Sequence, residues 1–171
     1  VLMSLPVDMP PIVIVQHMPP GFTASFAQRL NKNTSIEVSE LTASRLPLQA
    51  GHAYIANGDQ HMVVSEKGSQ YFASVENADP VNRHKPSVDV LFNSIAQNCS
   101  NNNVAVLLTG MGIDGASGMR NMLDKGSLTI AQDENSSVVW GMPRAAVERE
   151  AAAEILPLQK IGQFLVNTCY K

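Results

Sequence analysis

The residues NVAVLLTGMGIDGASGM, numbered 103–119, place an apolar run, a glycine-rich turn and the start of a helix in direct succession. The run Val104–Leu108 has no polar alternation, which is typical of a strand that is covered on both faces. Gly110, Gly112 and Gly115 then permit a tight turn into the helix. A strand that passes directly into a helix is the repeating unit of an α/β fold.

The same pattern recurs along the chain. PIVIVQH (residues 11–17) and SLTIAQD (residues 127–133) predict two more buried strands. Apolar residues at helical spacing predict helices in segments 21–32, 87–99, 115–126, 142–150 and 157–170. In the first of these helices Phe22, Phe26 and Leu30 share one face, and Thr23 is the expected N-cap.

Residues 52–75 differ in character, because short β-rich runs are separated by Asn57-Gly58 and by Lys67-Gly68-Ser69. These turn sequences predict hairpins and hence an antiparallel patch. We therefore predict an α/β, doubly wound, mainly parallel sheet with helices on both faces and a small antiparallel hairpin excursion. Residues 1–171 are expected to form one domain.

The first residues resemble the last turn of an apolar helix that stops at Pro6. No cap precedes this turn, so we expect the chain to begin inside an element of a longer protein.

Composition limits the function classes. The net charge of −3, with 12 scattered Lys and Arg, argues against nucleic-acid binding. Cys99 and Cys169 form no CxxC pair, which favours a reducing compartment without a disulfide. No apolar run approaches the roughly 20 residues of a membrane span, and no signal peptide is visible. We expect a cytoplasmic protein that does not insert into membranes.

Two polar residues stand where predicted strands end. His17 follows PIVIVQ, and Asp114 follows the run in residues 104–108. Ligands of open parallel sheets bind beyond the carboxyl ends of the strands. A histidine and an acid there form two thirds of a nucleophile–His–Asp arrangement, in which the acid orients the base. Asp114 is also expected at the start of the following helix, so a simple helix cap, and a satisfied histidine at 17, remain alternatives.

The glycines also match G-x-G-x-x-G, with Asp133 at the distance of a ribose-binding acid. A carboxylate at position 114 would repel a pyrophosphate on the same helix terminus. We therefore rank a dinucleotide-binding module on the Gly110–Gly115 turn second, expect no cofactor, and interpret Asp133 as a polar residue that ends a strand. His52, His61 and His84 are dispersed, so no metal site is predicted.

No convincing nucleophile is present in these 171 residues. Ser117 is the only serine close to Asp114, but its sequence context lacks the second glycine of G-x-S-x-G. We expect Ser117 to be a small helix residue that packs close to the sheet. Ser4 has no partner signal, and neither cysteine has a neighbouring base.

Five blocks of the sequence, between about residues 11 and 150, resemble successive blocks of the chemotaxis protein-glutamate methylesterase (CheB) catalytic domain. They are QHMPPGFTASFAQRLN, GHAYIANGDQHM, PVNRHKPSVDVLFNSIA, VLLTGMGIDGASGM and TIAQDENSSVVWGMPRAA. The resemblance implies hydrolysis of glutamate γ-methyl esters on chemoreceptors, and deamidation of receptor glutamines in many members, by a Ser-His-Asp triad. It implies His17 and Asp114 as the catalytic pair, and Met111 as the residue whose backbone N–H faces the oxyanion.

The family's serine lies in a G-A-S-T-G-G turn upstream of the helix that matches VLMSLP. The resemblance therefore implies a nucleophile upstream of Val1, and an N-terminal receiver domain in the parent chain. A catalytically inactive receptor-binding domain is the alternative if the serine is truly absent. The loop PVNRHKP, residues 80–86, either borders the substrate cleft or is a well-anchored surface loop.

Overall fold

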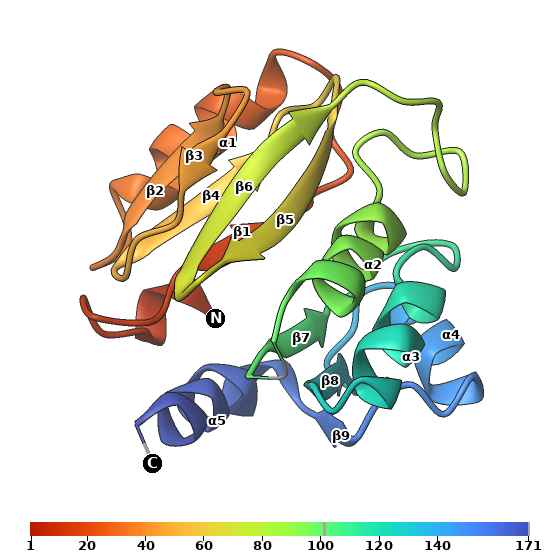
Figure 1. Ribbon diagram of the computed structural model, residues 1–171. Helices are drawn as coiled ribbons and strands as arrows, with labels where there is room; N and C mark the ends of the chain where they lie inside the picture. The colour runs from red at the N-terminus through yellow and green to blue at the C-terminus, as the bar shows by residue number, and fades with distance from the viewer. Residues whose placement is uncertain (101, 171) are drawn as a thin grey trace.

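The computed structural model describes residues 1–100 and 102–170, and within them the strands form three sheets of three strands each. Two sheets are parallel and one is antiparallel, and helices pack against them (Figure 1). The predicted α/β class with a small antiparallel excursion is confirmed. The parallel strands are divided between two separate sheets.

The first parallel sheet has the order β1-β4-β2, with β1 at Ile12–Ile14, β4 at His52–Ala56 and β2 at Glu37–Leu41. The predicted antiparallel pairing of β4 is wrong, because β4 is the central parallel strand and Ile55 within it is fully buried. Asn57-Gly58 lies in a turn that the Gln60 N–H closes onto the Asn57 carbonyl, but the strand that follows, residues 61–67, pairs in the antiparallel sheet and not with β4. A Cβ atom on Gly58 would lie 2.7 Å from the carbonyl group of Pro19, so this glycine permits close approach of the segment after β1.

The antiparallel sheet has the order β3-β6-β5, with β3 at Leu46–Pro47, β6 at Gln70–Glu76 and β5 at His61–Lys67. Lys67 pairs with Gln70, and Gly68 between them has a φ of 63°. The hairpin predicted at Lys67-Gly68-Ser69 is therefore confirmed.

The second parallel sheet has the order β7-β8-β9, with β7 at Val104–Leu107, β8 at Leu128–Gln132 and β9 at Glu154–Leu156. The two longer strands are those predicted from their apolar runs. Strand β9 was not predicted, because it is short and mostly exposed. Strand β2 was not predicted either, because its sequence EVSEL is largely polar.

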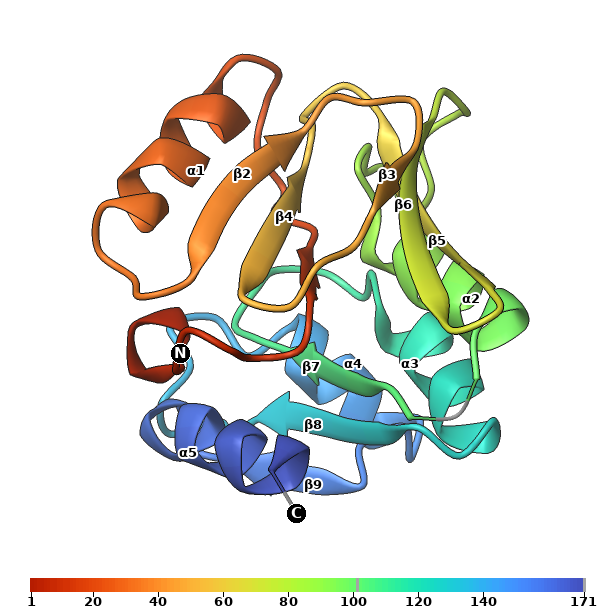
Figure 2. The same ribbon diagram turned by 60° about the vertical axis from the view of Figure 1, so that its left-hand side comes forward.

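The helices are α1 (Phe22–Asn31), α2 (Val88–Asn98), α3 (Ala116–Asp124), α4 (Met142–Glu148) and α5 (Leu158–Cys169). Helices α3 and α4 pack on one side of the second parallel sheet, and α5 lies on the other side (Figure 2). Within residues 1–100 and 102–170, no helix combines the length and apolar character that a membrane crossing requires.

Two local predictions near the N-terminus are corrected. Leu2–Ser4 form a 3-10 turn and not the end of an α-helix. The N-cap of α1 is Gly21, with a φ of 85°, and not Thr23. Thr23 is fully buried, and its hydroxyl donates a hydrogen bond to Glu40 and accepts one from the Gly58 N–H. Its side chain therefore ties α1 to the carboxyl ends of the strands instead of capping the helix.

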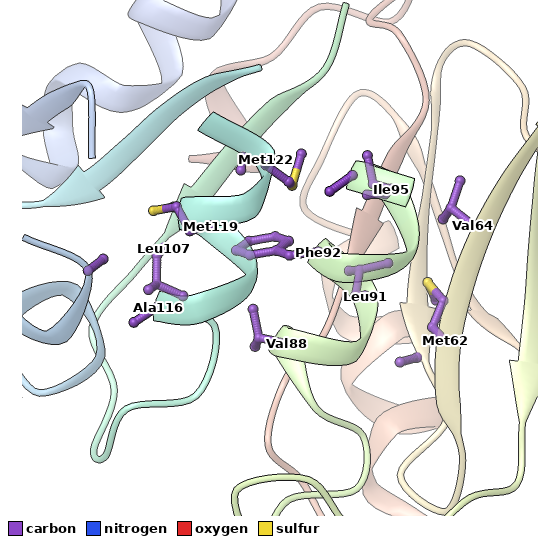
Figure 3. Close-up of a cluster of buried hydrophobic side chains, with 14 of the residues drawn as sticks. Met62, Val64, Val88, Leu91, Phe92, Ile95, Leu107, Ala116, Met119 and Met122 are labelled. Carbon is purple, nitrogen blue, oxygen red and sulfur yellow. The ribbon is translucent and has the colours of Figure 1, made fainter. Parts of the chain in front are cut away.

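Helix α2 lies between the antiparallel sheet and α3 (Figure 3). Leu91 and Ile95 point toward Met62 and Val64 of β5, whereas Val88 and Phe92 point toward α3. Apolar residues on two faces of α2 are thus buried at once, which fixes this helix against both of its neighbours. The position of its N-terminus matters for the site described next.

Candidate active site

His17 and Asp114, the predicted pair, are in direct contact. His17 lies in the segment between β1 and α1, and Asp114 lies in the turn between β7 and α3. Nε2 of His17 is 2.8 Å from Oδ2 of Asp114. The side chain of His17 is 20% exposed and that of Asp114 is fully buried, so one member of the pair reaches the surface.

The first turn of α2 supplies most of the remaining hydrogen bonds to Asp114. The hydroxyl of Ser87 donates to Oδ1 at 2.7 Å, the N–H of Val88 to Oδ2 at 2.7 Å, and the N–H of Asp89 to Oδ1 at 3.2 Å. The expectation that Asp114 starts its own helix is corrected, because the N-cap of α3 is Gly115. The carboxylate instead faces the positive end of the α2 dipole, contributed by a helix that precedes it by some 25 residues in the chain.

These contacts determine the charge of Asp114. Burial of the carboxyl works to raise its pKa, but the hydrogen bonds from His17, Asn82 and the first turn of α2 outweigh burial. They hold the pKa of Asp114 well below its usual range. The residue is therefore ionised at neutral pH, as an orienting acid must be.

The ionised carboxylate determines which nitrogen of His17 carries the proton. A carboxylate only accepts hydrogen bonds, so Nε2–H donates to Asp114 and Nδ1 of the neutral ring is unprotonated. No described residue forms a hydrogen bond with Nδ1. This nitrogen is the one that can take a proton from a nucleophile.

The loop at residues 80–86 contributes two contacts that the sequence analysis did not predict. Nδ2 of Asn82 donates to Oδ1 of Asp114 at 3.0 Å. The ring of His84 stacks on that of His17, with centroids 3.6 Å apart and planes 2° from parallel. Burial and the neighbouring His17 lower the pKa of His84, against an opposing effect of Asp114. His84 therefore favours the neutral form in which two imidazoles can stack without repulsion.

A pocket of about 340 Å³ lies beside His17, and the 80–86 loop forms one of its walls. The opposite wall is the Met18–Pro20 segment together with Gly58. The sequence left two alternatives for this loop, a border of the cleft or a well-anchored surface loop. The loop is both, since it lines the pocket and is bonded to Asp114 through Asn82. The basic side chains of Arg83 and Lys85 also line the pocket.

Met111 lies in the turn that precedes Asp114, and the residue is 80% exposed. The backbone of Gly110 holds this turn in place, since its N–H donates to Val139 and its carbonyl accepts from Gly141 and Met142. No described residue accepts a hydrogen bond from the Met111 N–H.

The remaining residues that the sequence singled out lie apart from the pair. A Cβ on Gly115 would come within 2.6 Å of Val88 and 2.9 Å of Leu107, so this glycine permits close packing of α3 against α2 and β7. Asp133 ends β8 as expected and accepts a hydrogen bond from the Ser136 N–H. In the described part of the chain, no group of three or more His, Cys, Asp or Glu side chains is placed to hold a metal ion.

Ser117 is exposed on α3, so the expectation that it packs close to the sheet is wrong. The adjacent Gly118 makes the close contact instead, since a Cβ there would lie 2.7 Å from Cβ of Phe92. No hydrogen bond joins Ser117 to His17 or Asp114 within the described residues. The structure therefore offers no role for Ser117 as a nucleophile.

Comparison with known protein families matches residues 1–165 to CheB methylesterase. The chain belongs to the CheB methylesterase family. The family suggested by the sequence blocks is thus confirmed.

Curated members of the CheB methylesterase family share about half of their residues with this chain. A protein-glutamate methylesterase/protein-glutamine glutaminase 2 of Vibrio vulnificus (strain YJ016) is 52% identical over 166 residues, which are 97% of this chain and 48% of that protein. A protein-glutamate methylesterase/protein-glutamine glutaminase of Salmonella typhi is 51% identical over 163 residues, or 95% of this chain and 46% of that protein. The chain spans about half the length of the curated relatives it matches.

A crystal structure of the Thermotoga maritima CheB methylesterase catalytic domain superposes with a TM-score of 0.93 at 36% identity. The superposition covers 98% of this chain and 88% of that one. The fold described above is therefore the fold of a CheB catalytic domain.

Asn82, His84 and Ser87 belong to this site but were not predicted from the sequence. Each reaches the pair from the segment between β6 and α2, which lies some 30 residues before Asp114 and far from His17 along the chain. The only available signal was the irregular, polar character of PVNRHKP, which indicates a loop but not where that loop packs.

Proposed function

We propose that this chain carries the histidine and the acid of a serine hydrolase that cleaves glutamate γ-methyl esters on chemoreceptors. The proposal includes deamidation of receptor glutamines, since the curated relatives are named for both activities. The observation that carries it is the 2.8 Å contact of His17 with a buried, ionised Asp114. That contact leaves Nδ1 of His17 free to act as a base.

The proposed reaction proceeds by acyl transfer. Nδ1 of His17 takes the hydroxyl proton of a serine that we place upstream of Val1, and the serine oxygen attacks the ester carbonyl carbon. The Met111 N–H donates to the oxygen that becomes negatively charged. Collapse of the intermediate expels the methoxy group, which leaves as methanol with the proton from His17.

The acyl-enzyme is then hydrolysed by the same groups in reverse order. His17 takes a proton from water, the hydroxide attacks the acyl carbon, and the serine leaves with the proton. The products are a glutamate side chain, the free serine and one methanol. For a glutamine substrate, ammonia replaces methanol. In both steps Asp114 stabilises the imidazolium without itself accepting a proton.

The proposal extends to the parent protein and its partners. We propose the chemoreceptors as the protein substrate, an N-terminal receiver domain in the parent chain, and a cytoplasmic location, with no nucleic-acid partner and no insertion into the membrane. These parts follow from the family, and the relatives' greater length agrees with an additional domain.

The two alternative functions have less support. A dinucleotide-binding module would place a pyrophosphate at the α3 N-terminus, where the ionised carboxylate of Asp114 directly precedes the N-cap and would repel it. An inactive receptor-binding domain would not require Nδ1 of His17 to be free, nor the Met111 N–H to be unpartnered.

The decisive experiment measures methanol release from methylated receptor by the full-length protein. His17→Ala is expected to lower kcat by about three orders of magnitude or more, because the proton transfer is lost. His52→Ala is the matched control, since His52 pairs with Glu37 at 3.0 Å at the opposite end of β4. A His17→Ala protein within tenfold of the wild-type rate would contradict the proposal.

A further inference from the structure

The segment at residues 80–86, which we call the strap, has an unusual backbone. Val81 and His84 pair through both of their backbone N–H and carbonyl groups, at 3.0 and 2.9 Å. Asn82 and Arg83 between them have φ values of 51° and 68°. Two consecutive positive φ values define a type I′ turn, which asparagine tolerates and arginine disfavours. Strained backbone of this kind persists only where other contacts stabilise it.

The amide of Asn82 supplies such contacts. Its Nδ2 donates to Oδ2 of Asp89 at 2.6 Å and to Oδ1 of Asp114 at 3.0 Å. Both carboxyl groups belong to buried residues. The two N–H bonds of a neutral amide thus satisfy one oxygen of each acid, and a rotated amide would place its oxygen against two carboxylates. The orientation of Asn82 is therefore determined by the two acids.

Asp89 connects this bridge to the core. Its Oδ1 accepts the N–H of Gly118 at 2.6 Å, which joins α2 to α3. Asp89 is itself in the first turn of α2, where the helix dipole favours a negative charge. Asn82 is therefore attached to α2 through Asp89, which is itself bonded to α3, and to the turn before α3 through Asp114.

The flanks of the strap are held independently of Asn82. His61 of β5 is buried, and its Nδ1 accepts the N–H of Ser87 at 3.1 Å. Its Nε2–H donates to the carbonyl of Asp79 at 2.9 Å. One neutral histidine thus fixes the residues on both sides of the strap. Loss of the Asn82 amide would release only the middle of the strap.

The middle of the strap carries His84, whose ring covers one face of His17. We propose that Asn82 is a positioning residue for the proposed hydrolysis: its amide ties the strap to Asp114 and Asp89, and so holds His84 against His17. With that face covered, the imidazole cannot turn away from Asp114, and Nδ1 stays directed toward the nucleophile. This inference rests on the proposed function, and it goes beyond it by assigning a residue that is outside the His17–Asp114 pair.

Two variants separate the amide from the backbone turn. Asn82→Gly removes the amide but accepts a positive φ at little cost. Asn82→Asp keeps the size but replaces the donor by an oxygen that faces two carboxylates. Glu150→Gly is the control for the first, because Glu150 is an exposed residue with a φ of 52° on another surface. Asn121→Asp on α3 is the control for the second, because it also loses an exposed amide contact, to Asn93, and adds one charge.

The first measurement is methanol release by the full-length variants over a range of pH. Asn82→Gly is expected to lower kcat by about 10- to 100-fold, as misplacement of a catalytic group by about 1 Å does, with KM changed less than about threefold. Asn82→Asp should lower kcat further. Its added negative charge favours the imidazolium form of His17, so the acid limb of the rate profile should move to higher pH. Both control variants should behave as the wild type.

The second measurement is the NMR spectrum of the histidine rings, which does not depend on catalysis. The signals of His17 and His84, assigned with His17→Gln and His84→Gln variants, should lose their mutual ring-current shifts in Asn82→Gly. If the wild type releases no methanol, the proposed function is wrong, and these shifts still decide whether Asn82 positions the rings.

The inference is overturned if Asn82→Gly keeps kcat within twofold of the wild type. It is equally overturned if the ring signals of His17 and His84 are unchanged in that variant, whatever the rate. A kcat that falls together with displaced ring signals supports it.

Discussion

Asp114→Asn perturbs the most highly connected group in the site without changing its shape. The new amide nitrogen replaces one of the two carboxylate oxygens. At the Oδ1 position it would face the donors of Asn82, Ser87 and the Asp89 N–H. At the Oδ2 position it would face His17 and the Val88 N–H. The second orientation costs less, because His17 can exchange its tautomer and accept a hydrogen bond from the amide.

The expected loss of stability follows from that orientation. The Val88 N–H would be left buried and unpaired, at a cost of about 1–3 kcal/mol. The remaining hydrogen bonds change from charge-assisted to neutral, which weakens each by about 1 kcal/mol. With three such hydrogen bonds on Oδ1, these effects together predict a decrease of about 4–6 kcal/mol in the free energy of unfolding, or a Tm lower by about 15 °C. Asp59→Asn, at an exposed position, is the control and should change stability by less than about 0.5 kcal/mol.

The same orientation predicts the effect on activity. When His17 accepts through Nε2, its proton is on Nδ1, and the ring cannot take a proton from the nucleophile. A wrong tautomer of this kind costs about four orders of magnitude in kcat in serine hydrolases. Methanol release by the full-length variant is the assay.

The pH dependence gives the sharpest test of the stability argument. The pKa of Asp114 is lowered in the folded state, so its stabilisation is complete above the unfolded value of about 3.9 and is lost as the pH falls through the folded value. The difference in unfolding free energy between wild type and Asp114→Asn should therefore narrow below about pH 4. A difference that is the same at pH 7 and pH 3 would refute the reasoning, because the charge would then contribute nothing.

Two further predictions concern packing and thiol reactivity. Gly118→Ala places a Cβ 2.7 Å from Cβ of Phe92 and should lower the unfolding free energy by about 1–3 kcal/mol in urea titrations; an equal loss in Ser117→Ala, on the exposed face of α3, would contradict this. Burial, together with the charge of Glu66, raises the pKa of the Cys99 thiol to about 11, so its alkylation by iodoacetamide at pH 8 should be about 100-fold slower than that of free cysteine. Peptide mass spectrometry measures the rate of alkylation. If Cys99 in the folded protein reacts as fast as it does in the protein unfolded by urea, the thiol is not protected.

Much of the fold was predictable because its signals are local. The apolar run of β7, the glycine-rich turn after it and the periodicity of α2 each report burial within about ten residues. The errors arose where a local signal had a second explanation. Asn57-Gly58 has hairpin chemistry, but the hydrogen bonds of β4 go to β1 and β2, and Gly58 instead permits contact with Pro19.

The contact of His17 with Asp114 was predictable for a different reason, since both residues follow strands of the same type and the resemblance to the CheB family agreed. The sequence alone could not show that the charge of Asp114 is stabilised by α2, because the glycines next to Asp114 point to α3 as the helix concerned. Likewise, nothing in PVNRHKP indicates that its histidine stacks on a ring 67 residues earlier in the chain.

Sequence by itself therefore determined helices α1 to α5, the apolar strands β1, β7 and β8, the α/β class and the two residues at the strand ends. Only the tertiary structure decided which atoms meet: Nε2 rather than Nδ1 of His17 on Asp114, across 97 residues of chain, and the Asn82 amide between two buried acids. The physical reason is that residue patterns report whether a segment is buried and how its backbone is hydrogen-bonded. The partners of a buried charge are set by how helices pack, and α2 owes its position to apolar contacts on two faces at once.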